Sequence, residues 1–174
     1  MNKIEHIDFT KMDVSDYVES LEHTSFTSRE LYNACQLFKQ MNEDENCTII
    51  LTIAGSTQAA GCLQLYRDLV KLNMVDIIVA TGASIIDMDL YEALGYHHYK
   101  ATTKVDDDEL RQKGIDRIYD TYIHEEDLKK VDQYVCDIAT QYSEGSIMSS
   151  REFLHLLGKH TPNSLVNECY EAGV

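Results

Sequence analysis

The chain has 174 residues, a formal net charge of −15 at pH 7 and a hydrophobic fraction of 44%. This length suits one domain, and the hydrophobic fraction supplies enough apolar residues for a core, which excludes wholesale disorder. The negative charge argues against nucleic-acid binding, because phosphate contacts need a basic face; it is compatible with a cationic partner such as a polyamine, or with a role in solubility alone.

The first part of the chain predicts an irregular arm followed by helices. Residues 1–13 show no periodic pattern, and Val14–Leu21 is typical of a short helix. The segment TSRELYNACQLFKQM then begins with Thr27 and has Glu30 three residues later, which is the spacing of a capping box. Its apolar residues recur at helical spacing, so we expect a helix over about residues 28–41.

Two short apolar segments with helical patterns after them indicate an α/β fold. CTIILTI (Cys47–Ile53) and VDIIVA (Val75–Ala80) are continuously apolar or β-branched, which is typical of strands buried on both faces of a parallel sheet. QAAGCLQLYRDLVKL lies between them, and MDLYEALG follows the second strand with Gly95 as its end. Alternation of strand and helix predicts a parallel sheet with crossover helices.

The second half is predicted to be more helical. Asp106–Gly114 begins with acidic residues and ends with glycine, as a helix dipole favours. Ile115–Ile123 alternates in part and is expected to be extended, whereas Glu125–Tyr142 has the apolar stripe of an amphipathic helix. Ser149 and Glu152 have capping-box spacing, and SLVNECYEAG predicts a last helix.

The cysteines and the ends of the chain bear on compartment. The five cysteines form no C-x-x-C pair, so neither a zinc site nor a thioredoxin-like motif is indicated, and a reducing cytoplasm is favoured. The polar N-terminal residues do not resemble a secretory signal. No apolar run approaches the roughly 20 residues of a membrane span, so we expect no membrane association.

The loop after the first predicted strand is a candidate phosphate site. It reads AGSTQAAG, in which Gly55 allows a tight turn. Ser56 and Thr57 place hydroxyl groups beside the start of the next helix, where free N–H groups favour a phosphate. Ligands of open α/β sheets bind beyond the carboxyl ends of the strands, which is where this loop is expected.

The loop after the second predicted strand, TGASIID, is the sister candidate. Gly82 and Ala83 leave room for a ligand against the backbone, and Asp87 could bond a ribose hydroxyl or a cationic amine. Neither loop matches a G-x-G-x-x-G or G-x-x-x-x-G-K-[ST] motif, so each is also compatible with a plain tight turn. His97 and His98 lack a further ligand at metal-site spacing, and we predict no metal site and no hydrolase triad.

Four stretches carry a resemblance to a known family: CTIILTIAGSTQAAG, LVKLNMVDIIVATGASIIDMDLYEALGYHHY, DDDELRQKGIDRIYDTYIHEEDL and SSREFLHLLGK. In this order and spacing they resemble the N-terminal half of the deoxyhypusine synthase family, in its bacterial and archaeal-type branch. The resemblance covers about Cys47 to Gly173. It implies residues 1–26 as an arm with a short helix, and residues 27–174 as the N-terminal part of a single NAD-binding domain.

The resemblance implies a Rossmann-like, three-layer parallel sheet that is incomplete at its C-terminal end. Family members form tetramers with NAD near the subunit interfaces. They oxidise spermidine with NAD and pass its aminobutyl group, through an imine on an enzyme lysine, to a lysine of a translation factor. Bacterial relatives are similar to homospermidine synthases or act on another acceptor.

The family's site residues carry over onto the two loops. The NAD contacts match Gly55, Ser56, Thr57, Gln58 and Ala59 in the first loop and Thr81, Gly82 and Ala83 in the second. An acidic contact to NAD or to the amine matches Asp87, with Asp89 as a further substrate contact. Family members carry adjacent glutamates there, whereas this chain reads Ile-Asp-Met-Asp.

Length separates this chain from the family. Members run about twice as far, and the nucleophilic lysine lies in the half that has no counterpart here, so no catalytic residue is assigned and the isolated chain is predicted to be inactive. We expect a fragment or split subunit of an NAD-dependent aminobutyl transferase that associates with itself or with a full-length homologue. The alternatives are a non-catalytic NAD-binding partner subunit, or an α/β small-molecule-binding domain unrelated to polyamines. A truncated sheet should expose a strand edge and apolar surface.

Overall fold

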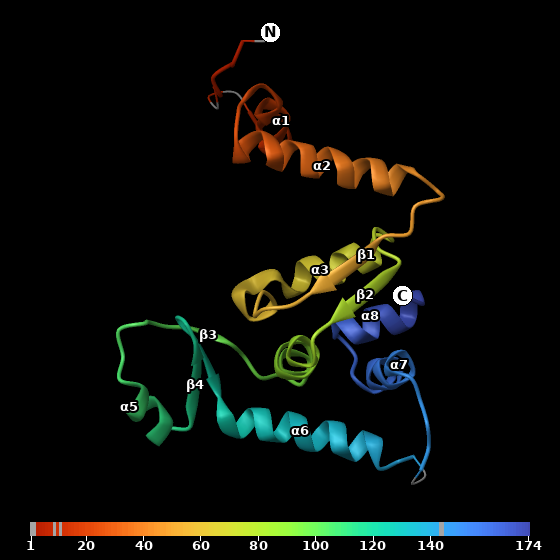
Figure 1. The fold of residues 1–174 in the computed structure, drawn as a ribbon. Coiled ribbons are helices and arrows are strands. Elements are labelled where there is room, and N and C mark those ends of the chain that lie inside the picture. Colours follow the sequence, from red (N-terminus) through yellow and green to blue (C-terminus); the bar gives the residue numbers. More distant parts are fainter. Residues whose placement is uncertain (1–2, 9, 11, 143–144) are drawn as a thin grey trace. The chain divides into compact units, whose positions relative to one another are not determined.

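The computed structural model describes residues 3–8, 10, 12–142 and 145–174. The chain forms two compact units, residues 1–49 and 50–174, which are described separately (Figure 1). Residues 1, 2, 9 and 11 of the expected N-terminal arm lie outside the described residues. No helix in the described part of the chain is long and apolar enough to span a membrane.

The first unit contains two helices and a short connecting turn. Helix α1 (Val14–Ser20) begins with a capping box between Asp13 and Asp16, the 3₁₀ turn η2 spans Leu21–His23, and α2 spans Thr27–Glu43. The predicted helix is therefore confirmed, but its predicted cap is wrong. Phe26 is the N-cap residue, with φ 59° and no side-chain hydrogen bond, so Thr27 is already the first helical residue.

The second unit contains a parallel pair of strands and a separate antiparallel sheet. Strand β1 (Ile50–Ile53) pairs in parallel with β2 (Ile77–Ala80), and Ile53 is the register partner of Ala80. The α/β class is confirmed. The predicted three-layer parallel sheet is not, because the parallel sheet of the described residues ends at these two strands.

The antiparallel sheet has the order β3-β5-β4, from β3 (Tyr99–Lys100), β4 (Ile115–Ile118) and β5 (Thr121–His124). The segment predicted to be extended is thus a hairpin, and Tyr119 lies at its turn with φ 53°.

Helices follow both parallel strands and fill the rest of the second unit. They are η3 (Gln58–Cys62), α3 (Leu63–Lys71), η4 (Ser84–Leu90), α4 (Tyr91–Ala93), α5 (Asp107–Gln112), α6 (Glu125–Ala139), α7 (Ser150–His160) and α8 (Leu165–Ala172). The capping box of Ser149 and Glu152 is present, which confirms that prediction. Gly173 ends α8 in the left-handed conformation, with φ 79°.

The core of the second unit lies between the helix that follows β2 and the C-terminal helices. Leu90 and Tyr91, at the junction of η4 and α4, are fully buried and belong to one apolar cluster with Val131 of α6, Leu157 of α7 and Val166 of α8. This packing fixes the segment that leaves the second candidate loop, because η4 begins directly after that loop.

The parallel strands are less buried than their sequence predicts. The side chains of Ile50, Ile77 and Val79 are 55%, 42% and 56% exposed, whereas both faces were expected to be covered. The register places these three side chains on one face of the pair. An apolar strand face needs a covering layer, and no described residue buries this one.

Candidate functional site

The two candidate loops leave the same edge of the parallel pair. Ile53 and Ala80 are register partners, and the Thr81 N–H donates to the Ile53 carbonyl at 3.1 Å. Because β1 and β2 run in the same direction, the loops that begin at Ala54 and Thr81 both lie beyond the carboxyl ends of the strands. This is the edge where ligands bind in open α/β sheets.

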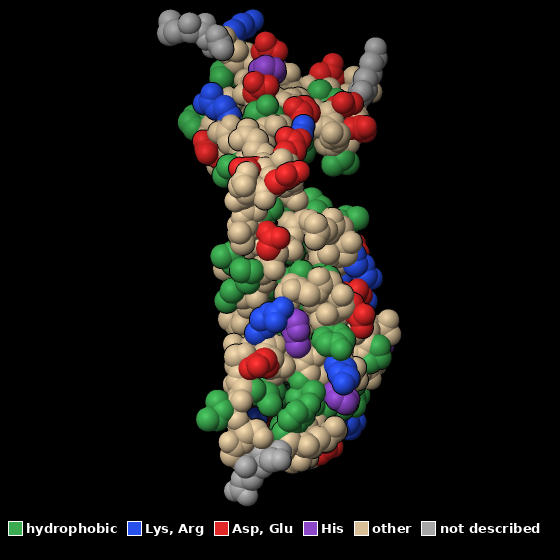
Figure 2. All heavy atoms as spheres, turned by 90° about the vertical axis from the view of Figure 1, so that its right-hand side faces the viewer, with side chains coloured by type: hydrophobic (Ala, Val, Ile, Leu, Met, Phe, Trp, Pro, Cys, Tyr) green, Lys and Arg blue, Asp and Glu red, His purple; other side chains and the backbone are tan. Residues whose placement is uncertain are grey.

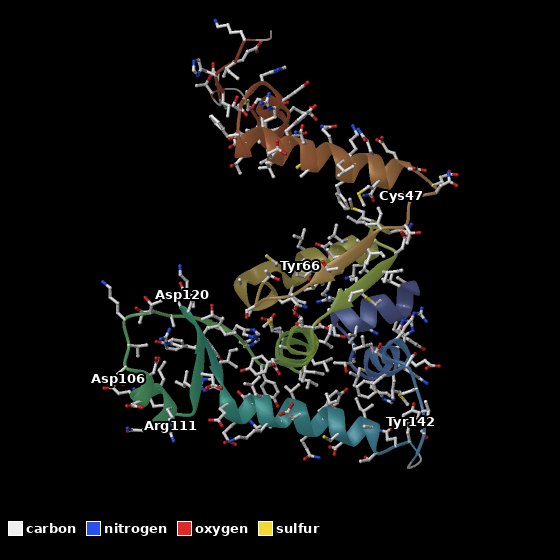
Figure 3. The ribbon with its side chains drawn as sticks, in the orientation of Figure 1. Cys47, Tyr66, Asp106, Arg111, Asp120 and Tyr142 are labelled. Atoms are coloured by element: carbon white, nitrogen blue, oxygen red, sulfur yellow. The ribbon has the colours of Figure 1, made fainter. Side chains whose placement is uncertain are left out.

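The first loop is a tight turn held against α3. Gly55 has φ +67°, and a Cβ atom at this position would meet no atom within 4 Å. The Thr57 N–H donates to the Gly55 carbonyl, which closes the turn. The Tyr66 hydroxyl, on α3 (Figure 3), donates to Thr57 Oγ1 at 2.9 Å. Ser56 is half-buried beside this turn. Sequence reasoning missed Tyr66, whose spacing from the loop carries no motif.

Gln58 is the most unusual residue of the first loop. Its side chain is only 1% exposed, and neither its Oε1 nor its Nε2 has a hydrogen-bond partner among the described residues. A buried amide without partners costs about 1–3 kcal/mol relative to a satisfied one. Such a group is rare in proteins unless a ligand, ion or water completes its bonds. Ala59 follows it in the same π-helical turn and is half-buried.

The second loop is exposed and anchored by a hydroxyl pair. Thr81, Gly82 and Ala83 are all exposed, and a Cβ on Gly82 would meet nothing within 4 Å. Thr81 Oγ1 and Ser84 Oγ lie 2.9 Å apart, and the Ser84 N–H also points to Thr81 Oγ1 at 3.3 Å. Ser84 was not predicted, although a Thr followed three residues later by Ser is a recognisable local capping pattern.

Asp87 is half-buried in η4. Burial raises the pKa of its carboxyl group, and the nearby negative charge of Asp132 on α6 raises this pKa further. These causes show that the carboxyl group has lost solvent and shares its surroundings with a second acid. A cationic or hydroxyl-bearing ligand would relieve both effects, which is the chemistry that the sequence predicted for this residue.

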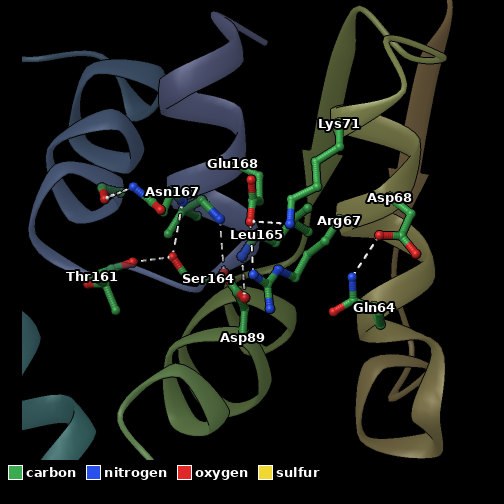
Figure 4. A network of polar contacts seen from close by, with 12 residues as sticks. Gln64, Arg67, Asp68, Lys71, Asp89, Thr161, Ser164, Leu165, Asn167 and Glu168 are labelled. Atoms are coloured by element: carbon green, nitrogen blue, oxygen red, sulfur yellow. Dashed lines mark hydrogen bonds and ion pairs between the residues drawn. The ribbon is translucent and has the colours of Figure 1, made fainter.

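Asp89 serves the fold. It is fully buried, and its two carboxylate oxygens accept hydrogen bonds from the backbone N–H groups of Leu165 and Val166, at 2.6 and 3.0 Å (Figure 4). These donors form the start of α8, so the carboxylate satisfies N–H groups that a helix leaves unpaired. We therefore assign Asp89 to the anchoring of α8 and do not carry its expected substrate contact further.

The surroundings of Asp89 set its charge state. Burial raises the pKa of this carboxyl group to about 6, although the two backbone donors and the positive charge of Arg67 act in the opposite direction. Arg67 also pairs with Glu168 at 2.8 Å, and Lys71 reaches the same carboxylate at 3.0 Å (Figure 4). Together these contacts tie η4, α3 and α8 into one framework beneath the candidate loops.

The histidine pair belongs in part to the packing. His98 Nδ1 lies 2.7 Å from Glu92 Oε1, and its ring stacks at a tilt on Tyr91 with 5.1 Å between the ring centroids. Within the described ranges, no group of three or more His, Cys, Asp or Glu side chains is placed to hold a metal ion.

Comparison with known proteins identifies the family. The family model for deoxyhypusine synthase matches residues 16–174. The chain belongs to the deoxyhypusine synthase family. Among curated proteins it is similar to deoxyhypusine synthase-like proteins of Coxiella burnetii (51% identity), Caulobacter vibrioides (44%) and Chlorobaculum tepidum (44%). Each match covers 98% of this chain and 50%, 48% and 50% of the relative. The chain therefore spans about half the length of these relatives.

A solved structure shows the same fold. The structure described as "Crystal Structure of a putative deoxyhypusine synthase from Entamoeba histolytica" matches with a TM-score of 0.65 and 18% sequence identity. The match covers 98% of this chain and 62% of that one. At this identity the likeness concerns the arrangement of the backbone, and it places the elements described above within the fold of the family.

Proposed function

We propose that this chain is the cofactor-binding half of a deoxyhypusine synthase-like, NAD-dependent aminobutyl transferase that uses spermidine or a related polyamine. Membership of the family supports the reaction class. The observation that carries the assignment to this site is the buried, unpartnered amide of Gln58 at the edge where both loops leave the sheet. A bound dinucleotide would supply the donors and acceptors that this amide lacks.

The residues present fit a dinucleotide. Gly55 has the left-handed backbone that the turn requires, and the backbone of Gly82 and Ala83 is open to solvent. Ser56 adds a hydroxyl, and Asp87 offers a carboxylate to a ribose hydroxyl or an ammonium group. When bound, NAD would accept a hydride from the polyamine. The part of this chain in the proposal is to bind the cofactor, to orient it at the carboxyl edge, and to hold the amine through Asp87.

The nucleophile must come from elsewhere. Covalent transfer of an aminobutyl group needs an amine nucleophile in surroundings that lower its pKa. The resemblance matches no lysine of this chain to that position, and the chain spans half the length of its relatives. We therefore propose that a complementary half supplies the lysine, and that this chain alone binds cofactor without turnover.

Calorimetric titration with NAD tests the proposal. The wild-type chain should bind NAD, alone or with the complementary half, and Gly82→Leu should lower the affinity at least about tenfold, which is 1.4 kcal/mol. Gly82 has open space around it, so this variant should keep the wild-type Tm. Ala172→Leu, at an exposed position on α8, is the matched control and should bind as the wild type does. Absence of NAD binding under both conditions would refute the proposal.

The half-length match also favours a second candidate, a non-catalytic partner subunit of a full-length homologue. In that case the chain should change the activity of the homologue when the two are mixed, through loops that complete an interface site. Transfer from spermidine by the two halves alone, without a full-length homologue, would decide for the first proposal. NAD binding without any response to spermidine in either mixture would instead favour a small-molecule-binding domain with no polyamine role.

A further inference from the structure

Strand β2 has an open edge whose backbone groups point away from β1. The Thr81 N–H donates to Ile53, so the groups of Val79 and Ile77, two and four residues earlier, also face β1. Those of Ile78 and Ala80 alternate with them and face the other side. No described strand pairs with this side, because the sheet of the described residues ends at β2.

A groove runs along this open edge. Its volume is about 520 Å³, and every residue from Asp76 to Ala80 lines it. The opposite wall is formed by α7 and α8, with Leu154, Leu165 and Val166 among the lining residues. A groove that follows one strand for its whole length, with apolar side chains opposite, has the shape of a missing neighbouring strand.

The end of the described chain is held at the same groove. Gly173 and Val174 line it, and the Arg151 guanidinium donates to the Gly173 carbonyl at 3.1 Å. The His155 ring donates through Nε2 to the Val174 carbonyl at 2.9 Å. In a family whose N-terminal half this chain resembles, residues that follow the position of Val174 would therefore begin beside β2.

The surface around the groove is apolar enough to need a cover. Ile77 and Val79 continue the open edge onto the exposed face of the parallel pair, where Ile50 also lies. On the side of the second unit turned to the viewer in Figure 2, hydrophobic side chains are interspersed with basic and histidine side chains, whereas acidic side chains gather on the first unit. An exposed edge beside apolar surface is a template for pairing with another chain.

We propose that the open edge of β2 receives, in parallel orientation, a strand from a polypeptide equivalent to the half of the relatives that this chain lacks. The half-length match is the observation that selects this occupant over an unrelated peptide. The inference rests on the proposed split of the transferase and not on NAD binding. The added strand bonds to the backbone of Ile78 and Ala80, and its side chains cover Leu154, Leu165 and Val166.

Hydrogen exchange followed by NMR tests this proposal in the intact chain. The probe is the part of the Coxiella burnetii relative outside its match to this chain, expressed as a separate polypeptide. On mixing, the amides of Ile78 and Ala80 should gain at least tenfold protection. The amide of Thr52, which points to the far edge of β1 by the same alternation, should not gain it. Protection at β1 alone, at neither strand, or in this chain by itself through self-association would overturn the proposal.

A pair of proline variants gives an independent readout. Ile78→Pro removes one N–H from the open edge of β2, and Thr52→Pro removes one from the open edge of β1, so neither breaks the ladder between the strands. Association with the complementary half should weaken at least tenfold in Ile78→Pro and stay unchanged in Thr52→Pro. Equal weakening in both, or in neither, would overturn the proposal. NAD binding is measured separately, so its failure with intact strand protection would refute only the proposed function.

Discussion

The buried amide of Gln58 makes a prediction with opposite signs for stability and binding. Gln58→Met keeps the length and unbranched shape of the side chain and removes both polar atoms, neither of which has a partner among the described residues. The side chain is 1% exposed, so water does not compensate its amide in the free chain. We therefore expect the variant to be more stable than the wild type, by about 1–3 kcal/mol of unfolding free energy.

Urea unfolding without NAD measures this first sign. A gain of each kcal/mol should raise the Tm by about 2–4 °C in a chain of this size. Gln64→Met is the control: Gln64 is an exposed residue of α3 whose Nε2 donates to Asp68 at 2.7 Å. Surface substitutions of this kind usually change the unfolding free energy by less than about 0.5 kcal/mol.

Calorimetric titration with NAD measures the second sign. If the amide is kept unsatisfied for the cofactor, Gln58→Met should lose NAD affinity by about tenfold or more, whereas Gln64→Met should keep it. Loss of stability in Gln58→Met would show that the amide has a structural partner, and the argument from Gln58 would then fail. Higher stability with unchanged NAD affinity would separate the buried amide from the cofactor and remove the observation on which the proposed site depends.

Three further variants test the framework beneath the loops. Asp89→Ala should destabilise the chain more at pH 5 than at pH 7.5, by about 1–2 kcal/mol in urea unfolding: its folded pKa, raised to about 6, makes its contribution largest at low pH and smaller as the pH rises through 6, so a difference that grows with pH would contradict this. Glu168→Gln should cost about 1–3 kcal/mol, because its ion pair with α3 is largely buried, whereas Glu126→Gln at an exposed pair should cost under about 0.5; equal costs would refute the distinction. Gly158→Ala should lower the Tm by more than about 5 °C, because the new Cβ would overlap the Val166 carbonyl, and an unchanged Tm would show that α7 and α8 can separate freely.

The sequence predicts the local elements well where local chemistry decides them. The two apolar strands, the small-residue turns after them and the capping box of Ser149 each depend on residues within a few positions of one another. The cap at Thr27 was mispredicted for the same reason in reverse: Phe26 adopts a left-handed conformation, which no local pattern in the sequence announces.

What the sequence could not predict depends on distant contacts. Asp89 looks like a loop acid in sequence, but its partners are backbone groups of Leu165 and Val166, 76 and 77 residues away. Continuous apolarity in β2 predicted burial on both faces, yet Val79 is 56% exposed. The pattern records the covering that the strand is built to receive, and the described residues do not provide it.

For the candidate site, the placement of both loops at one sheet edge follows from the parallel pairing that the strand pattern predicts. The unsatisfied state of Gln58 could not be read from sequence, because nothing in AGSTQAAG shows which of its side chains is enclosed. The residue was assigned only through the family resemblance, and the structure adds a physical reason to test it.

Folding and assembly are carried by different parts of the second unit. The apolar cluster of Leu90, Tyr91, Val131 and Leu157, together with the contacts of Asp89 to α8, lies on the helical side and is complete among the described residues. The open edge at Ile78 contributes nothing to that cluster. A half with a finished core can fold and hold its cofactor loops in place while one strand edge stays open. Stability and association should therefore respond to different substitutions, with helix contacts controlling the first and the β2 edge controlling the second.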